Sequence, residues 1–188
     1  MADFPNVLDT PSSGGGAYTL IDSYSQSNVA NLSITNIPAT YSSLLFIIDV
    51  MTLVSGIRQP SMVVSINNGS SYLNTNEYDH STTLVNGATG TAQGLTAQAQ
   101  IRLCYNALVM DSGSVGFSMT HEIFNYNLAV ANGTAFHRWS YNTAETGTSQ
   151  VMAGVGSAFS RITSAIDAFQ IYMGASNINI DARLYGMT

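Results

Sequence analysis

The chain of 188 residues contains no lysine, and arginine supplies all five of its basic residues. Without lysine there is neither a P-loop nor a Schiff-base enzyme. Charged residues make up only 9% of the sequence, against about 25% in an average globular protein. The formal net charge is -6, so the phosphate backbone of a nucleic acid is repelled rather than bound. We therefore expect no nucleic-acid partner.

Cysteine and long hydrophobic runs are also scarce. The single cysteine, Cys104, excludes an intramolecular disulfide and a cysteine-based zinc site. The most apolar window, residues 44–54, is interrupted by Asp49 and Thr52 and is shorter than the roughly 20 residues that span a bilayer. We therefore expect no membrane insertion. Hydrophobic residues nevertheless form 45% of the chain, which is enough to bury a core.

Apolar residues recur with period two from Tyr18 onward, and turn residues separate the short apolar runs. This pattern predicts a single all-β domain over residues 17–188, a jelly-roll-like β-sandwich of eight or more strands. The segment 44–53 alternates two apolar faces and is predicted as a central strand covered on both sides. The dipeptide Asn68-Gly69 predicts a tight turn with positive φ angles.

Two segments lack this alternation. Residues 85–97 have only Leu95 as a bulky apolar residue and are predicted as a long exposed loop. Residues 1–16 are rich in Pro, Ser and Gly, which predicts a short extended arm. Phe4, Val7 and Leu8 are the bulky apolar side chains of this arm, and we interpret them as attachment residues that dock on a partner.

The sequence contains no G-x-S-x-G elbow and no dinucleotide-binding glycine pattern. Three alternatives involving chemistry remain open: a histidine metal site, a cysteine nucleophile and a pair of hydrolytic carboxylates. We prefer the ordinary explanation that these side chains are core or solvated residues, and we expect no catalytic residue, no metal site and no cofactor. The residues concerned are His80, His121 and His137; Cys104; and Glu77, Asp79, Glu122 and Glu145.

Aromatic residues give a stronger indication of function. Tyr78 lies in "EYDH", and Trp139 and Tyr141 lie in "HRWSY". Each combines a flat ring with hydrogen-bonding neighbours, as carbohydrate recognition requires. We interpret these three residues as candidate carbohydrate-binding residues. Core packing and a subunit interface are the alternative explanations.

Several segments, in this order, resemble the small all-β proteins and tail-fibre C-terminal domains of tailed bacteriophages. They are "ITNIPATYSSLLFIIDV", "VSINNGSSYL", "HEIFNYN", "ITSAIDAFQIYM" and the terminal "LYG". The resemblance covers about Tyr18 to Thr188. The sequence departs from the family's pattern at Ile66, where an aromatic residue is common, and in the small-residue segment "TAETGTSQVMAGVGSAF".

The resemblance implies a structural protein of the virion that has no enzymatic activity and is assembled in the host cytoplasm. The first expectation is a tail-fibre or receptor-binding appendage module that contacts the host surface. The alternative is a head decoration or head-fibre protein that stabilises the capsid. Expected partners are other virion proteins, two further copies in a homotrimer, and a glycan of the host surface. The arm at residues 1–16 would attach the domain to the particle.

Overall fold

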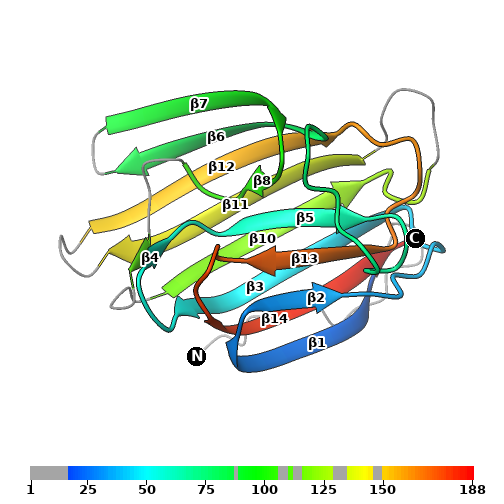
Figure 1. Cartoon of the computed structure of the whole chain (residues 1–188), viewed down its shortest axis with the longest axis horizontal. Helices are drawn as coiled ribbons and strands as arrows, with labels where there is room; N and C mark the ends of the chain where they lie inside the picture. The colour runs from blue at the N-terminus through cyan, green and yellow to red at the C-terminus, as the bar shows by residue number, and fades with distance from the viewer. Residues whose placement is uncertain (1–16, 87–88, 106–109, 112–115, 129–134, 146–149) are drawn as a thin grey trace, which may run out of the picture.

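β-Strands are the main element of the computed structural model (Figure 1). The structure describes residues 17–86, 89–105, 110–111, 116–128, 135–145 and 150–188. Within these ranges there are fourteen strands and no α-helix. Nothing in this part of the chain is therefore a helix long and apolar enough to cross a bilayer.

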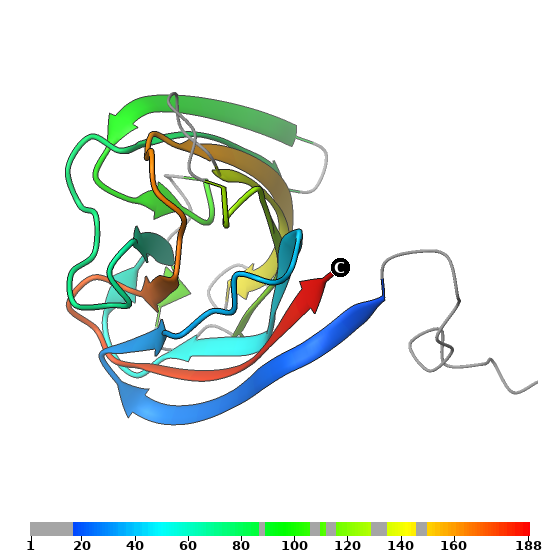
Figure 2. The same ribbon diagram turned by 90° about the vertical axis from the view of Figure 1, so that its right-hand side faces the viewer.

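Eight strands form one antiparallel sheet in the spatial order β1-β14-β3-β10-β11-β12-β6-β7. Its strands are β1 Tyr18–Val29, β3 Ser43–Leu53, β6 Tyr78–Asn86, β7 Thr89–Gln98, β10 Gly116–Phe124, β11 Ala135–Glu145, β12 Gln150–Ser160 and β14 Ile178–Met187. This large sheet is strongly curved, and Figure 2 shows it wrapping around the smaller strands.

Four strands form the second sheet, in the order β2-β13-β5-β8, and two short strands pair separately. The bounds are β2 Asn31–Ile34, β13 Ala168–Tyr172, β5 Ser61–Ser65 and β8 Ile101–Arg102, with β4 Ile57–Arg58 and β9 Met110–Asp111 as the separate pair. The two sheets pack together, which confirms the predicted all-β sandwich. Its jelly-roll character stays a prediction.

The core lies between the two sheets and follows the period-two pattern of the sequence. On β14, Ile178, Ile180, Ala182 and Leu184 are all buried, as the alternation in this segment predicts. Phe46 of the large sheet meets Phe169 of the small sheet edge to face, with ring centroids 5.1 Å apart. Such an edge contact between aromatic rings stabilises the packing of the two sheets by more than the burial of the rings alone.

Strand β3 is central, as predicted, because β14 and β10 pair with its two edges. The expectation that both of its faces are covered is wrong. An extra residue at Asp49–Val50 forms a bulge, since Ile48 pairs with Ala182 whereas Val50 pairs with Asp181. The bulge turns Met51 into the core and leaves Val50 on the outer face, where it is 38% exposed.

The predicted loop at residues 85–97 is also wrong, because most of this segment is strand β7. Strand β7 pairs with β6 along its length and forms an edge of the large sheet. An edge strand exposed on its faces needs few bulky side chains, so its Gly, Thr and Ala content misled the prediction. The turn prediction is confirmed, since Asn68 and Gly69 have φ angles of 55° and 78°.

Candidate functional site

The three aromatic residues predicted to bind carbohydrate are buried, with exposed fractions of 0% for Tyr78, 2% for Trp139 and 1% for Tyr141. The Trp139 Nε1 donates a hydrogen bond to the carbonyl oxygen of Leu103 at 2.9 Å. The Tyr141 hydroxyl donates to the carbonyl oxygen of Thr83 at 2.8 Å. No ring face remains open for a sugar, so this prediction is corrected: the three rings are core residues.

Tyr78 has a similar structural role. Its hydroxyl accepts a hydrogen bond from the Val64 amide at 2.9 Å and donates one to the carbonyl oxygen of Leu73 at 3.0 Å. Burial raises the pKa of the Tyr78 hydroxyl far above its usual value. The ring thereby links β6 of the large sheet to β5 of the small sheet.

The small residues of β12 include two glycines that leave room for aromatic rings of β11. Gly156 pairs with Trp139 and Gly154 pairs with Tyr141 across the β11–β12 ladder. A Cβ atom at Gly156 would lie 2.2 Å from the Trp139 ring, and one at Gly154 would lie 2.5 Å from the Tyr141 ring. The rings therefore occupy the space in which side chains of β12 would otherwise stand.

All three histidines of the protein are buried on the inner face of the large sheet. His121 Nε2 lies 3.1 Å from His137 Nδ1, and His137 Nε2 lies 2.9 Å from the Ser160 hydroxyl. Burial lowers the pKa of His137 to about 3 and that of His80 to about 4, and it holds the pKa of His121 well below its usual range. These rings are therefore neutral at neutral pH.

The histidines do not assemble into a three-ligand metal site. His80 lies on β6, separated from His137 by strand β12. No group of three possible metal ligands occurs among the residues that the structure describes. The Nδ1 atoms of His80 and His121 are buried without a hydrogen-bond partner there.

The proposed nucleophile, Cys104, is fully buried. Burial raises the pKa of its thiol to about 12. Since the thiolate is the reactive form, the side chain is inert at neutral pH. Cys104, which lies just after β8, is therefore a buried core residue.

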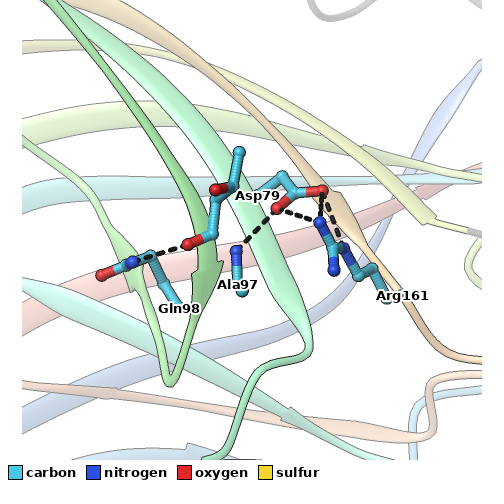
Figure 3. A network of polar contacts seen from close by, with 5 residues as sticks. Asp79, Ala97, Gln98 and Arg161 are labelled. Atoms are coloured by element: carbon cyan, nitrogen blue, oxygen red, sulfur yellow. Dashed lines mark hydrogen bonds and ion pairs between the residues drawn. The ribbon is translucent and has the colours of Figure 1, made fainter.

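The described carboxylates that were considered for hydrolysis are engaged by neighbouring groups. Figure 3 shows Asp79, which accepts hydrogen bonds from the Ala97 amide and from Arg161, each at 2.8 Å. The Ala97 hydrogen bond and the Arg161 charge lower the pKa of Asp79. Glu77 accepts a hydrogen bond from the Thr75 amide at 2.6 Å. The side chain of Glu145 lies outside the described residues, as do Phe4, Val7 and Leu8.

A hollow lies on the outer face of the large sheet, the face opposite the core. It has a volume of about 720 Å³ and crosses strands β10, β11, β12 and β6. We call it the outer groove and define it by Ser81, Thr120, Glu122, Arg138, Ser140 and Ser157. Trp139 also borders it, but with only 2% of its surface exposed it offers no ring face there.

A second hollow of about 360 Å³ continues the outer groove toward β7 and shares Ser81 and Ser157 with it. Its walls include Phe136, Phe159 and Leu95. The rings of Phe136 and Phe159 lie 5.2 Å apart across the β11–β12 ladder. Phe124 pairs with Phe136 on the other side. These three phenylalanines form a row across three strands, which we call the phenyl ridge.

An ion pair forms one wall of the outer groove. Arg138 Nε donates to Glu122 Oε2 at 2.8 Å, and its guanidinium lies over the Phe124 ring at 5.6 Å. Partial burial raises the pKa of Tyr18 on β1, and the charge of Glu122 raises it further. The charges of Arg138 and Glu122 compensate each other, so the wall presents hydrogen-bonding groups without net charge.

The prediction from sequence selected the wrong face of β11. In the stretch Phe136 to Tyr141, the charged Arg138 identifies the solvent side, and period two then places Phe136 and Ser140 beside it. The same rule directs Trp139 and Tyr141 toward the core. The alternation around Arg138 therefore identifies the outer face of β11 from the sequence. The prediction was wrong because it selected the tryptophan and tyrosine for their large rings instead of following this alternation.

Searches against protein-family models, curated proteins and solved structures find no match to this chain.

Proposed function

We propose that the protein is a structural module of a tailed-bacteriophage particle, part of a tail fibre or receptor-binding appendage that contacts the host surface. The observation that supports a binding role is the outer groove with its phenyl ridge. Phe136 in this ridge is 53% exposed, and Val155, which borders the outer groove, is 56% exposed. Exposed apolar side chains grouped beside polar ones are typical of interaction sites.

The sequence resemblance and the composition support the same proposal. A surface rich in hydroxyl and amide groups but poor in charge lets copies meet without burying unpaired ions. On this proposal three copies form a homotrimer, and the interface excludes the outer groove. The β-sandwich supplies a rigid scaffold on which the groove keeps its shape.

A head decoration protein is the second candidate, and strand β7 favours it. This edge strand of ten residues, "TGTAQGLTAQ", has no charged residue and no proline. Charge and proline are two of the means by which edge strands avoid pairing with other chains. An edge without them suits a protein that lies against neighbours in a capsid lattice.

The two candidates are separated by the position of the protein on the particle. Particles that carry an epitope after Thr188 should bind gold-labelled antibody at the distal part of the tail. The isolated protein should also compete with these particles for adsorption to host cells. Label confined to the head, without competition, would support the decoration role instead, and label on neither part would reject both candidates.

A chain that begins at Ala17 tests the proposed arm. We expect it to keep the melting temperature and oligomeric state of the full protein, because the described strands begin only at Tyr18. It should fail to join particles that lack the native copy, since residues 1–16 are proposed to make the attachment. Calorimetry, light scattering and blotting of purified particles measure these outcomes. Normal incorporation would reject the arm's role.

A further inference from the structure

We propose that the outer groove and the adjoining phenyl ridge form a binding site for an uncharged oligosaccharide in an extended conformation. One part of this proposal rests on the proposed function, namely that the ligand belongs to a host surface. The binding itself depends on the residues of the large sheet and is tested on the isolated protein.

The two adjacent hollows, which share Ser81 and Ser157, together have the dimensions of a site for a chain rather than for a single small molecule. Together they extend from Glu122 on β10 to Leu95 on β7. These strands are four intervals apart in the sheet, which corresponds to about 19 Å at the usual strand spacing. The outer groove, with its volume of about 720 Å³, is also within the usual range for ligand sites.

The floor of the outer groove presents hydroxyl groups. Ser81, Ser140 and Ser157 are exposed there, and they make no side-chain hydrogen bond within the described part of the chain. Thr83 differs, because its hydroxyl is already engaged by the backbone of Val155. A serine hydroxyl both donates and accepts, so it matches the hydroxyl groups of a sugar in either orientation.

The phenyl ridge supplies the apolar half of the site. Each sugar ring has one face formed largely by C–H groups, and such a face packs on an aromatic ring. Phe136 is half-exposed, and its ring is supported by Phe159 at 5.2 Å. The ridge lies beside the hydroxyl floor because Phe136 and Arg138 are on the same face of β11. An amphipathic ligand is therefore contacted on both its apolar and its polar sides.

The electrostatics favour an uncharged ligand. Arg138 is paired with Glu122, and Arg161 at the far side is paired with Asp79. An anionic ligand would have to compete with these carboxylates and would also approach a chain of net charge -6. A neutral sugar needs neither pair to break, because the remaining donor and acceptor positions of the guanidinium and carboxylate are available for hydroxyl groups.

The test uses the full chain and an array of neutral and anionic bacterial-surface oligosaccharides, with titration calorimetry of any sugar that binds. We expect binding to neutral members of at least three units. Ser157→Tyr fills the floor shared by the two hollows and should abolish binding. Phe136→Ala should weaken it about tenfold, the loss expected for one aromatic contact. Ser25→Tyr, an exposed position on edge strand β1, is the matched control and should bind as the unchanged protein does.

Three results would overturn the proposal: no binding of any neutral oligosaccharide at millimolar concentration, binding of anionic members alone, or full binding by Ser157→Tyr. Circular dichroism establishes that each variant is folded. Failure of this proposal is distinct from failure of the proposed function. A protein found on the phage tail that binds no sugar would reject only the ligand. A protein that binds sugar but is absent from particles would reject only the proposed location.

Discussion

Replacing Gly154 with alanine is expected to remove more than about 4 kcal/mol from the free energy of unfolding, or to prevent folding. The added Cβ would lie 2.1 Å from the carbonyl oxygen of Thr83 and 2.5 Å from the Tyr141 ring. The Thr83 carbonyl belongs to β6, a strand paired on both edges, so it cannot retreat without disrupting a ladder. Urea unfolding followed by circular dichroism measures the loss.

Gly94→Ala is the matched control for this prediction. Gly94 also lies in the large sheet, but a Cβ atom there would meet nothing within 4 Å. Its replacement should change the free energy of unfolding by no more than about 1 kcal/mol, with stabilisation the expected direction, because glycine weakens a strand. A Gly154→Ala protein as stable as Gly94→Ala would show that the close packing described around β12 is wrong.

Acid is expected to unfold the protein well above the pH at which its carboxylates titrate. His80, His121 and His137 are neutral in the folded state because burial lowers their pKa values. In the unfolded chain each takes up a proton as the pH falls below about 6.5. Stability is therefore complete above pH 6.5 and is lost as the pH falls toward the folded-state pKa values, which are about 4 for His80 and about 3 for His137.

Three such protons give a slope of at most about 4 kcal/mol per pH unit. This slope is large compared with the 5–15 kcal/mol that usually stabilises a domain. Urea unfolding at intervals from pH 7.5 to pH 4.5 measures it. His80→Gln should reduce this slope by the contribution of one proton, which is about a third of the total. Asp79 contributes only at more acidic pH, because its pKa is lowered from 3.8. A constant stability from pH 7 to pH 5 would contradict the prediction.

Much of the fold follows from alternation along the sequence. On β14, the residues from Ile178 to Leu184 alternate strictly, and the structure buries the predicted side. The pattern is informative here because one face of the strand meets the core and the other faces outward. The same reasoning predicts the two-sheet class, since many short alternating strands separated by turns need two layers to bury their apolar sides.

The bulge in β3 and the order of the strands did not follow from the sequence. The alternation at Ile47 to Leu53 is compatible with an unbroken strand, and only the pairing with β14 and β10 shows that Asp49–Val50 contains an extra residue. Strand order depends on contacts between residues far apart in the chain, such as Trp139 with the carbonyl oxygen of Leu103. Local patterns contain little information about such contacts.

The candidate site was less predictable than the fold. Its polar wall joins Glu122 and Arg138, which are adjacent only because β10 pairs with β11 in one particular register. A shift of that register by one residue would place the two side chains on opposite faces of the sheet. The hydroxyl floor has no signal of its own, because serine occurs throughout the chain. Sequence alone could identify the exposed face of β11, but not the groove.

The fit of Trp139 over Gly156 and of Tyr141 over Gly154 restricts the order in which these positions can change during evolution. A side chain at either glycine collides while the ring is present, so the aromatic residue has to become smaller first. That first step leaves a cavity, at a cost of about 3–5 kcal/mol. Both orders therefore pass through a poorly folded intermediate. Descendants of this protein should keep each aromatic residue together with its glycine, unless earlier stabilising substitutions provide enough reserve to cross the gap.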